Sequence, residues 1–401
     1  MHMHVAETSR GEVDPRRRRT VAVVLAAIVI PMIIATVIGL VALSPRGETP
    51  VGSVPTFAQG SERVVGVVTV IGTTDEYGQT PVSMSVDGVD VPLAVPYEIV
   101  ASSLDVGDRV EALFSPDSVS TDGATPAYVF VDFDRSRALV IIAVLYVLSV
   151  LLVARVKGVL AMLGLGLSLA VLMAFMIPAL MVGKPELLVV LTGAAAMMIV
   201  SIYIAHGVSI RTTTALVGTA MGLVVTACLA AWAIDAANIS GATDESGQFA
   251  LSMIPGISLP SLMLCGMILA GLGALNDVTI TQVSTVWELY ESDPSAPRLT
   301  LVARAMRVGR DHIASTVYTL AFAYVGSALP LLLVSALMDT GITGVVQSAD
   351  VAEEIARTLI ASIGLILAIP LTTIIAASLA PIAPTSRAKE ERSVASSTAK
   401  R

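Results

Sequence analysis

The sequence predicts an α-helical polytopic membrane protein with a small β-barrel-like domain outside the cytoplasm. Of the 401 residues, 55% are hydrophobic and only 14% are charged, whereas a soluble domain has about 25% charged residues. Long apolar runs recur along the chain, and one segment shows strand-like alternation instead. One water-soluble core cannot bury this much apolar surface, so lipid must cover part of it.

Eight apolar runs come near the length of about 20 residues that a helix needs to cross the hydrocarbon core. They are Thr20–Leu43, Ala138–Ala154, Val159–Met181, Leu187–Ala205, Thr213–Ile234, Leu259–Leu275, Ile313–Leu337 and Ile355–Ala380. We therefore predict about eight transmembrane helices, with one anchor at residues 20–43 and seven helices in a domain of residues 137–381.

The first run has two interpretations. Arg16–Arg19 precede it and could be the basic region of a signal peptide. The run is 24 residues long, however, which exceeds a typical signal peptide core, and no clean small-x-small cleavage site follows. An uncleaved anchor is favoured over a cleaved signal. Residues 1–19 would then form a basic cytoplasmic N-terminus, and residues 382–401 a disordered cytoplasmic tail.

Orientation follows from lysine and arginine in the short loops, which favour the cytoplasmic side. With the N-terminus inside, the short predicted outer loops hold Lys184 alone before Arg357 at the start of the last span. The predicted inner loops and tail hold Arg155, Lys157, Arg211, Arg298, Arg304, Arg307, Arg310, Arg387, Lys389, Arg392, Lys400 and Arg401. This asymmetry predicts that both termini are cytoplasmic.

Residues 44–136 separate the first two runs and are expected to form the outer domain. Alternating stretches predict strands at Val64–Ile71, Val82–Leu93, Gly107–Phe114 and Ala127–Phe133, with a turn at Asp87-Gly88. This pattern predicts an OB-like or SH3-like barrel. The segment has 14 acidic residues and four arginines, a net charge of −10. A solvated module is the favoured interpretation, and attraction of cations or of a cationic partner is the alternative.

A polar stripe marks the sixth run. Asp277, Thr281, Ser284 and Glu288 recur at helical spacing and would share one face. A helix from Leu259 to Glu288 would be about 45 Å long. Either its inner half projects into the cytoplasm or Asn276-Asp277 marks a break.

Asp277 makes this stripe a functional hypothesis, because a carboxylate at bilayer depth costs about 2.5–3.5 kcal/mol on insertion scales. The alternative is that Asp277 lies at the inner interface and pairs with an arginine. Function is preferred here. The expected transport-path residues are Asn276, Asp277, Thr281, Gln282, Ser284, Glu288, Asp311 and His312.

Three arginines, Arg304, Arg307 and Arg310, are spaced to share a helix face. Ordinary cytoplasmic anchoring is the simpler explanation. The alternatives are a gate, a lipid headgroup contact or a counter-charge for Asp277 or Glu288. Asp311 is expected at the positive end of the seventh helix, and a proton relay through the neighbouring His312 is a weaker alternative to a simple hydrogen bond.

The sequence shows no motif typical of catalysis, nucleotide binding or metal binding. The sequence has no P-loop, GxSxG, HExxH or CxxC pattern. Cys228 and Cys265 both lie in apolar runs and are expected to be small packing residues. We therefore expect no catalytic residues, no metal and no cofactor, and a protein that is not an enzyme. Scarce aromatic residues, 4% of the chain, argue against nucleic acid as a partner.

Two blocks carry a family resemblance. They are the Gly-Ala-Leu-Asn-Asp-Val-Thr-Ile-Thr-Gln block at residues 273–282 and the Gly-Arg-Asp block at residues 309–311. With the order of anchor, outer domain and about seven spans, the chain resembles the bacterial YibE/F family from Glu62 to Pro381. The resemblance implies a multi-pass bacterial inner-membrane protein and supplies no substrate.

The leading functional hypothesis is a secondary transporter or permease for a small solute or ion, with Asp277 carrying an ion or proton and Thr281 and Gln282 lining the path. The second hypothesis is a membrane scaffold or sensor whose acidic outer domain binds a partner. The lipid bilayer is an expected partner under both, and a homo-oligomer is left open.

Overall fold

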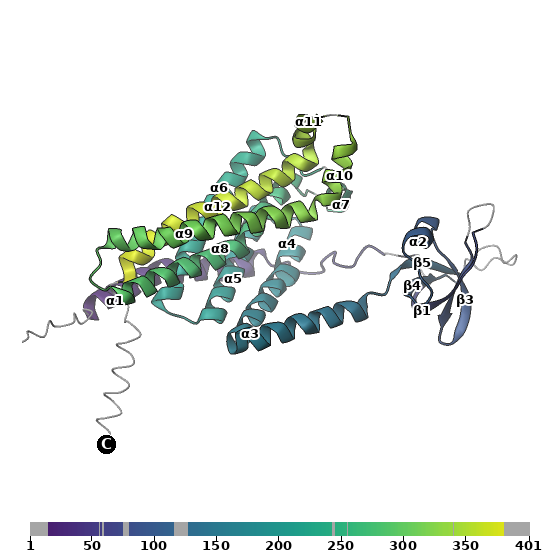
Figure 1. Cartoon of the computed structure of the whole chain (residues 1–401), viewed down its shortest axis with the longest axis horizontal. Helices are drawn as coiled ribbons and strands as arrows, with labels where there is room; N and C mark the ends of the chain where they lie inside the picture. The colour runs from purple at the N-terminus through teal and green to yellow at the C-terminus, as the bar shows by residue number, and fades with distance from the viewer. Residues whose placement is uncertain are drawn as a thin grey trace, which may run out of the picture. The chain divides into compact units, whose positions relative to one another are not determined.

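The computed structural model of the chain describes residues 15–55, 57, 60–74, 80–115, 127–242, 245–254, 256–339 and 341–380. Residues 1–14 of the predicted cytoplasmic N-terminus and the expected tail at 382–401 lie outside these ranges. The chain divides into two compact units, residues 1–51 with 159–401 and residues 52–158. Figure 1 shows a helical part and a small strand-rich part.

The strand-rich unit contains a closed five-stranded barrel. Its elements are β1 (Glu62–Ile71), β2 (Val82–Val86), β3 (Val89–Ala94), the short helix α2 (Tyr97–Ser102), β4 (Arg109–Phe114) and β5 (Tyr128–Phe133). The strand order is β1-β2-β3-β5-β4. The pairs are antiparallel except β3 with β5, which run parallel at Leu93 and Tyr128. The predicted barrel is confirmed, and this order is that of an OB-type Greek-key barrel.

The barrel has its own apolar core, to which alternate residues of the strands contribute. Val68, Met84, Leu93 and Val110 are almost fully buried in it. Asp87 and Gly88 both have positive φ in the turn between β2 and β3, as a two-residue hairpin turn requires. The predicted strands and turn are therefore formed, and only α2 was not anticipated.

We expect a fragment of residues 61–137 to fold alone and to lose stability in acid. Hydrogen bonds from Ser136 and Arg109 lower the pKa of Asp134 to about 2. This pKa lies below the ordinary value of 3.8. The ionised carboxylate therefore stabilises the fold above about pH 4, and this stabilisation is lost as the pH falls towards 2. Circular dichroism melts should show strand content and a melting temperature that drops across this interval.

A matched pair of variants identifies the group responsible. Asp134→Asn should lower the melting temperature at pH 7 and flatten the acid dependence, whereas Asp90→Asn, at an exposed position on β3, should change neither. A helical or structureless spectrum of the fragment would refute an autonomous barrel.

The rest of the described chain is almost entirely helical. The helices are α1 (Pro15–Leu43), α3 (Ser136–Val171), the π-helical segment η2 (Leu172–Met176), α4 (Ile177–Met181), α5 (Glu186–His206), α6 (Ile210–Ala236), α7 (Glu245–Met253), α8 (Leu259–Ser292), α9 (Arg298–Ser327), α10 (Leu329–Leu337), α11 (Gly341–Gln347) and α12 (Ala349–Leu379). Within the described residues, six helical segments are long and apolar enough to cross a membrane, and a bent pair, α9 with α10, qualifies as a further span.

Two helix breaks bear on the eight predicted runs. Residues 136–181 qualify together as one apolar helical segment of 46 residues, but a kink at Arg155, whose backbone is non-helical at φ 52° and ψ −132°, divides the segment into two helices. This division agrees with the two runs predicted there. The run at 313–337 is bent by 63° between Ser327 and Leu329. Pro330 follows at the first turn of α10, where its missing N–H is tolerated.

Helix α8 lies at the centre of the helical unit, packed against α5, α6, α9 and α12. Figure 1 shows α9 running alongside α12. Small residues permit this close packing: a Cβ at Gly218 of α6 would overlap Thr372 of α12, and one at Gly364 of α12 would overlap Thr226 of α6. Such contacts fix the register of the central helices.

Candidate functional site

Helix α8 presents the predicted polar stripe on its outer face and a second polar row inside the bundle. The helix is continuous through Asn276-Asp277, so the alternative of a break there is wrong. Asp277 and Glu288 are exposed, and Thr281 and Ser284 are partly exposed between them. On the opposite side of the helix, Thr279 and Gln282 are fully buried. The structure therefore separates the expected path residues into two groups.

Asp277 faces His312 of the neighbouring α9. Asp277 Oδ2 lies 3.9 Å from His312 Nε2, and the side chains are 75% and 28% exposed. This distance is too long for a direct hydrogen bond. The pair is ionic only when the imidazole is protonated.

The inner row of α8 contacts three other helices through uncharged polar groups. Asn276 Nδ2 donates to Ser201 Oγ of α5 at 3.0 Å. The hydroxyls of Thr279 and Thr219 of α6 lie 2.6 Å apart. Thr373 Oγ1 of α12 lies 3.2 Å from Gln282 Oε1 and 2.7 Å from the carbonyl oxygen of its own helix at Ile369. It has one hydrogen and cannot fully serve both acceptors.

Several buried polar atoms in this region have no hydrogen-bond partner among the described residues. They are Asn276 Oδ1, Gln282 Nε2, His312 Nε2 and Thr372 Oγ1. Gln282 is only 1% exposed, and its amide packs on α9 so closely that a Cβ at Gly309 would lie 2.5 Å from Nε2. Most buried polar groups in proteins are paired, so this concentration marks the interior of α8, α9 and α12 as the candidate site.

The arginines lie near one end of the bundle and do not pair with Asp277. Arg304 contacts Asp293, with Nη1 3.2 Å from Oδ2, and hydrogen bonds from Ser295 and Arg304 lower the pKa of Asp293. Glu288 pairs loosely with Arg211 at 3.5 Å. The alternative in which the three arginines are counter-charges for Asp277 or Glu288 is therefore not observed, because His312 lies nearest to Asp277 and Arg211 to Glu288.

Arg307, Arg310 and Asp311 are all exposed on α9. The prediction that Asp311 begins this helix is wrong: α9 starts at Arg298, because the polar, arginine-containing segment before the apolar run is helical as well. Asp311 therefore lies in mid-helix, away from the positive end of the helix dipole.

A separate group of carboxylates lies near the N-terminal ends of α5 and α12. Glu186 of α5 accepts a hydrogen bond from the Ser258 N–H at 3.0 Å, and buried Glu353 of α12 accepts one from the Gly241 N–H at 2.9 Å. These two carboxylates tie together loops that connect the spans.

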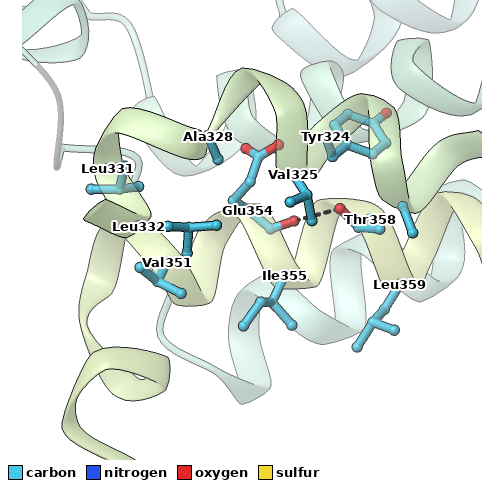
Figure 2. A pocket seen from close by; sticks show the side chains of 11 residues that line it. Tyr324, Val325, Ala328, Leu331, Leu332, Val351, Glu354, Ile355, Thr358 and Leu359 are labelled. Atoms are coloured by element: carbon cyan, nitrogen blue, oxygen red, sulfur yellow. Dashed lines mark hydrogen bonds between the residues drawn. The ribbon is translucent and has the colours of Figure 1, made fainter. Parts of the chain in front are cut away.

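Glu354 instead lines a cavity of about 230 Å³ at the bend between α9 and α10. Figure 2 shows Glu354 among Tyr324, Ala328 and aliphatic side chains of α9, α10 and α12. This cavity was not anticipated from the sequence, because it depends on the bend between α9 and α10. In the part of the chain that the structure describes, no three His, Cys, Asp or Glu side chains are grouped as metal ligands would be.

The buried threonines were also missed by sequence reasoning. They lie within apolar runs, where a hydroxyl is usually expected to bond to its own helix. They are Thr219, Thr279, Thr372 and Thr373. One usable signal is the Thr372-Thr373 pair two residues after Pro370, since adjacent hydroxyls face different neighbours. The structure shows these faces, with Thr373 toward α8 and Thr372 toward α6.

Comparison with known protein families finds that residues 142–381 match the family model described as YibE/F-like protein. The match covers more than half of the chain and includes helices α4 to α12, and hence Asp277, Gln282, His312 and Glu354. The barrel lies outside the matched residues. No curated protein and no solved structure matches the chain.

Proposed function

Since the chain belongs to the YibE/F-like family and its apolar helices make it a membrane protein, we propose that it is a secondary transporter or permease for a small solute or ion. The observation that carries this proposal is the concentration of partnerless buried polar atoms around α8, next to the Asp277–His312 pair. The proposal gives no residue a catalytic role.

The energetic argument concerns Asp277. A carboxylate at membrane depth costs about 2.5–3.5 kcal/mol on insertion scales, and among the described residues no arginine pairs with Asp277. A purely structural role would favour a neutral residue or a closely paired charge. We propose that Asp277 binds the proton or cation, and that His312, which lies beside it, takes part in the same binding step.

The uncharged groups of the inner row would line the path. Gln282 and Asn276 each keep one polar atom without a partner, so each can contact a passing solute without first breaking a hydrogen bond. Thr281 lies between Asp277 and Gln282 on the side of α8 that is partly exposed. Arg304, Arg307 and Arg310 remain proposed as a gate or as contacts for lipid headgroups.

We propose eight spans, with both termini in the cytoplasm of a bacterial cell and the barrel outside the inner membrane. Residues 136–181 would be about 69 Å long as one helix, more than twice the thickness of a hydrocarbon core of about 30 Å. Two spans that meet at the non-helical Arg155 fit better. Reporter fusions at the two termini should both report the cytoplasm, and an external C-terminus would contradict the eight-span count.

The scaffold or sensor alternative draws support from the barrel, which has a core of its own and lies outside the matched family region. Comparing a deletion strain with its complemented parent separates the two functions. A transporter should alter the uptake or cellular content of a specific solute when it is lost. If solute profiles are unchanged while a barrel deletion reproduces the deletion phenotype, the partner-binding function would be supported instead.

A further inference from the structure

The cavity at the bend between α9 and α10 has almost entirely apolar walls. Its apolar walls include Leu331 and Leu332 of α10 and Val351, Ile355 and Leu359 of α12. Its volume is about 230 Å³, enough for a small organic molecule and not for a large one. The cavity lies at the 63° bend between α9 and α10, which qualify together as one broken span, and transporters commonly bind their substrates at such breaks.

Glu354 is the one charged residue among those that line this cavity. Its side chain is only 23% exposed, and Figure 2 shows the carboxylate pointing from α12 towards the bend near Ala328. The ring of Tyr324 lies on the same side of the cavity (Figure 2). The cavity therefore combines a negative charge and an aromatic ring with aliphatic walls.

Arg357 only partly offsets the charge of Glu354. Its Nη1 lies 3.6 Å from Glu354 Oε2, which is long for a charge-assisted hydrogen bond. Its Nη2 donates instead towards Met263 Sδ of α8 at 3.6 Å, and Arg357 does not line the cavity. The guanidinium is therefore held on the α8 side, and the carboxylate keeps room for a second cation.

We propose that this cavity binds a small organic cation with an apolar body, such as an aryl-alkyl ammonium ion. An anion would be repelled by Glu354, and a neutral apolar molecule would bury the carboxylate without compensation. A cationic head between Glu354 and the Tyr324 ring gains an ion pair and a cation–π contact, while the apolar body fills the space between the leucines and Ile355.

The test uses the purified full chain in phosphatidylcholine nanodiscs and radiolabelled benzyltrimethylammonium as the probe. We expect saturable binding above empty nanodiscs. Unlabelled benzyltrimethylammonium should displace the probe, whereas neopentylbenzene, which has nearly the same shape and no charge, should not. Equal displacement by the two compounds would show that the cavity is an apolar crevice for lipid chains and would overturn the proposal, as would the absence of saturable binding.

Three variants locate the binding. Glu354→Gln should weaken it about tenfold, the equivalent of losing one moderate ionic contact, and Arg357→Gln should strengthen it because the competing cation is removed. Asp350→Asn, one turn earlier on α12 and exposed, should leave it unchanged. Unchanged affinity in a folded Glu354→Gln protein would contradict the proposal, and the comparison of charged and neutral competitors still decides if that variant does not fold.

The cavity is separate from the proposed transport site at Asp277. His312 and Tyr324 are 12 residues apart on α9, or about 18 Å along the helix. Asp277→Asn should therefore bind the probe as the wild type does. If Asp277→Asn binds benzyltrimethylammonium normally but no longer changes the cellular solute profile as the wild type does, both proposals are supported. If the wild type binds the probe but its deletion changes no cellular solute, the transport role alone is overturned.

Discussion

Replacing Asp277 with asparagine is expected to abolish solute flux while the amount of protein in the membrane stays near that of the wild type. The substitution keeps the size of the side chain and removes its charge. Because Asp277 is largely exposed and 3.9 Å from His312, the packing of α8 does not depend on the carboxylate. Flux and membrane abundance, measured on the same preparations, should therefore separate.

Glu288→Gln is the matched control on the same face of α8. The sequence alone placed Glu288 among the path residues, but its contact with Arg211 is loose and exposed, and the proposed transport step does not use it. Such a surface pair contributes roughly 0–1 kcal/mol, so both flux and abundance should stay near normal. A fall in abundance for Asp277→Asn would instead indicate a structural pair with His312, and exchanging the two residues should then restore it. Full flux in Asp277→Asn would end the assignment of Asp277 as the transport residue.

The second large effect is expected from Gly218→Val in α6. A Cβ at this position would overlap Thr372 Oγ1 and lie 3.1 Å from the Cβ of Thr372. The valine must therefore push α6 and α12 apart, and overpacking of this kind costs about 1–3 kcal/mol or more. We expect most of the protein to be lost from the membrane, as measured by quantitative immunoblotting and by thermal unfolding in detergent.

The same substitution at Gly273 of α8 provides the control. A Cβ there would meet nothing within 4 Å. Gly273→Val should therefore leave the membrane abundance of the protein nearly unchanged, provided that no other chain packs on this face of α8. If Gly218→Val is tolerated as well as Gly273→Val, the close packing of α6 on α12 is wrong. If both are lost, the exposed face of α8 is covered in the membrane by another chain or segment.

The sequence was informative where a pattern depends on local chemistry. The strands of the barrel follow from their alternation, and the hairpin between β2 and β3 follows from Asp87-Gly88, whose positive φ angles match the turn. The helix α2 was missed because it has six residues and buries none of them. No apolar periodicity can therefore indicate it.

The limits of the transmembrane helices were harder to predict, because apolarity ends before the helix does. Helix α8 continues to Ser292, beyond the apolar run that ends at Leu275, since no helix-breaking residue intervenes before Asp293-Pro294. The bend after Ser327 depends on how α10 packs back towards α12, and Pro330 alone does not specify its angle.

The candidate site was predicted in part. Asp277, Asn276, Gln282 and His312 were identified because charged and amide groups are unusual in apolar segments. Their division into an outer pair and an inner row could not be predicted, since it depends on which face of α8 meets α6 and α12. Glu354 escaped notice because it lies near the start of a span, where a carboxylate is ordinary.

The most direct test of the proposed transport role is untargeted uptake and metabolite profiling of three strains that carry the wild-type protein, the deletion or Asp277→Asn. If Asp277 is the transport residue, the deletion and Asp277→Asn strains should share the same altered solutes, and the variant protein should be present at normal abundance. A profile for Asp277→Asn that matches the wild type, or a deletion strain whose solutes do not change, would contradict it.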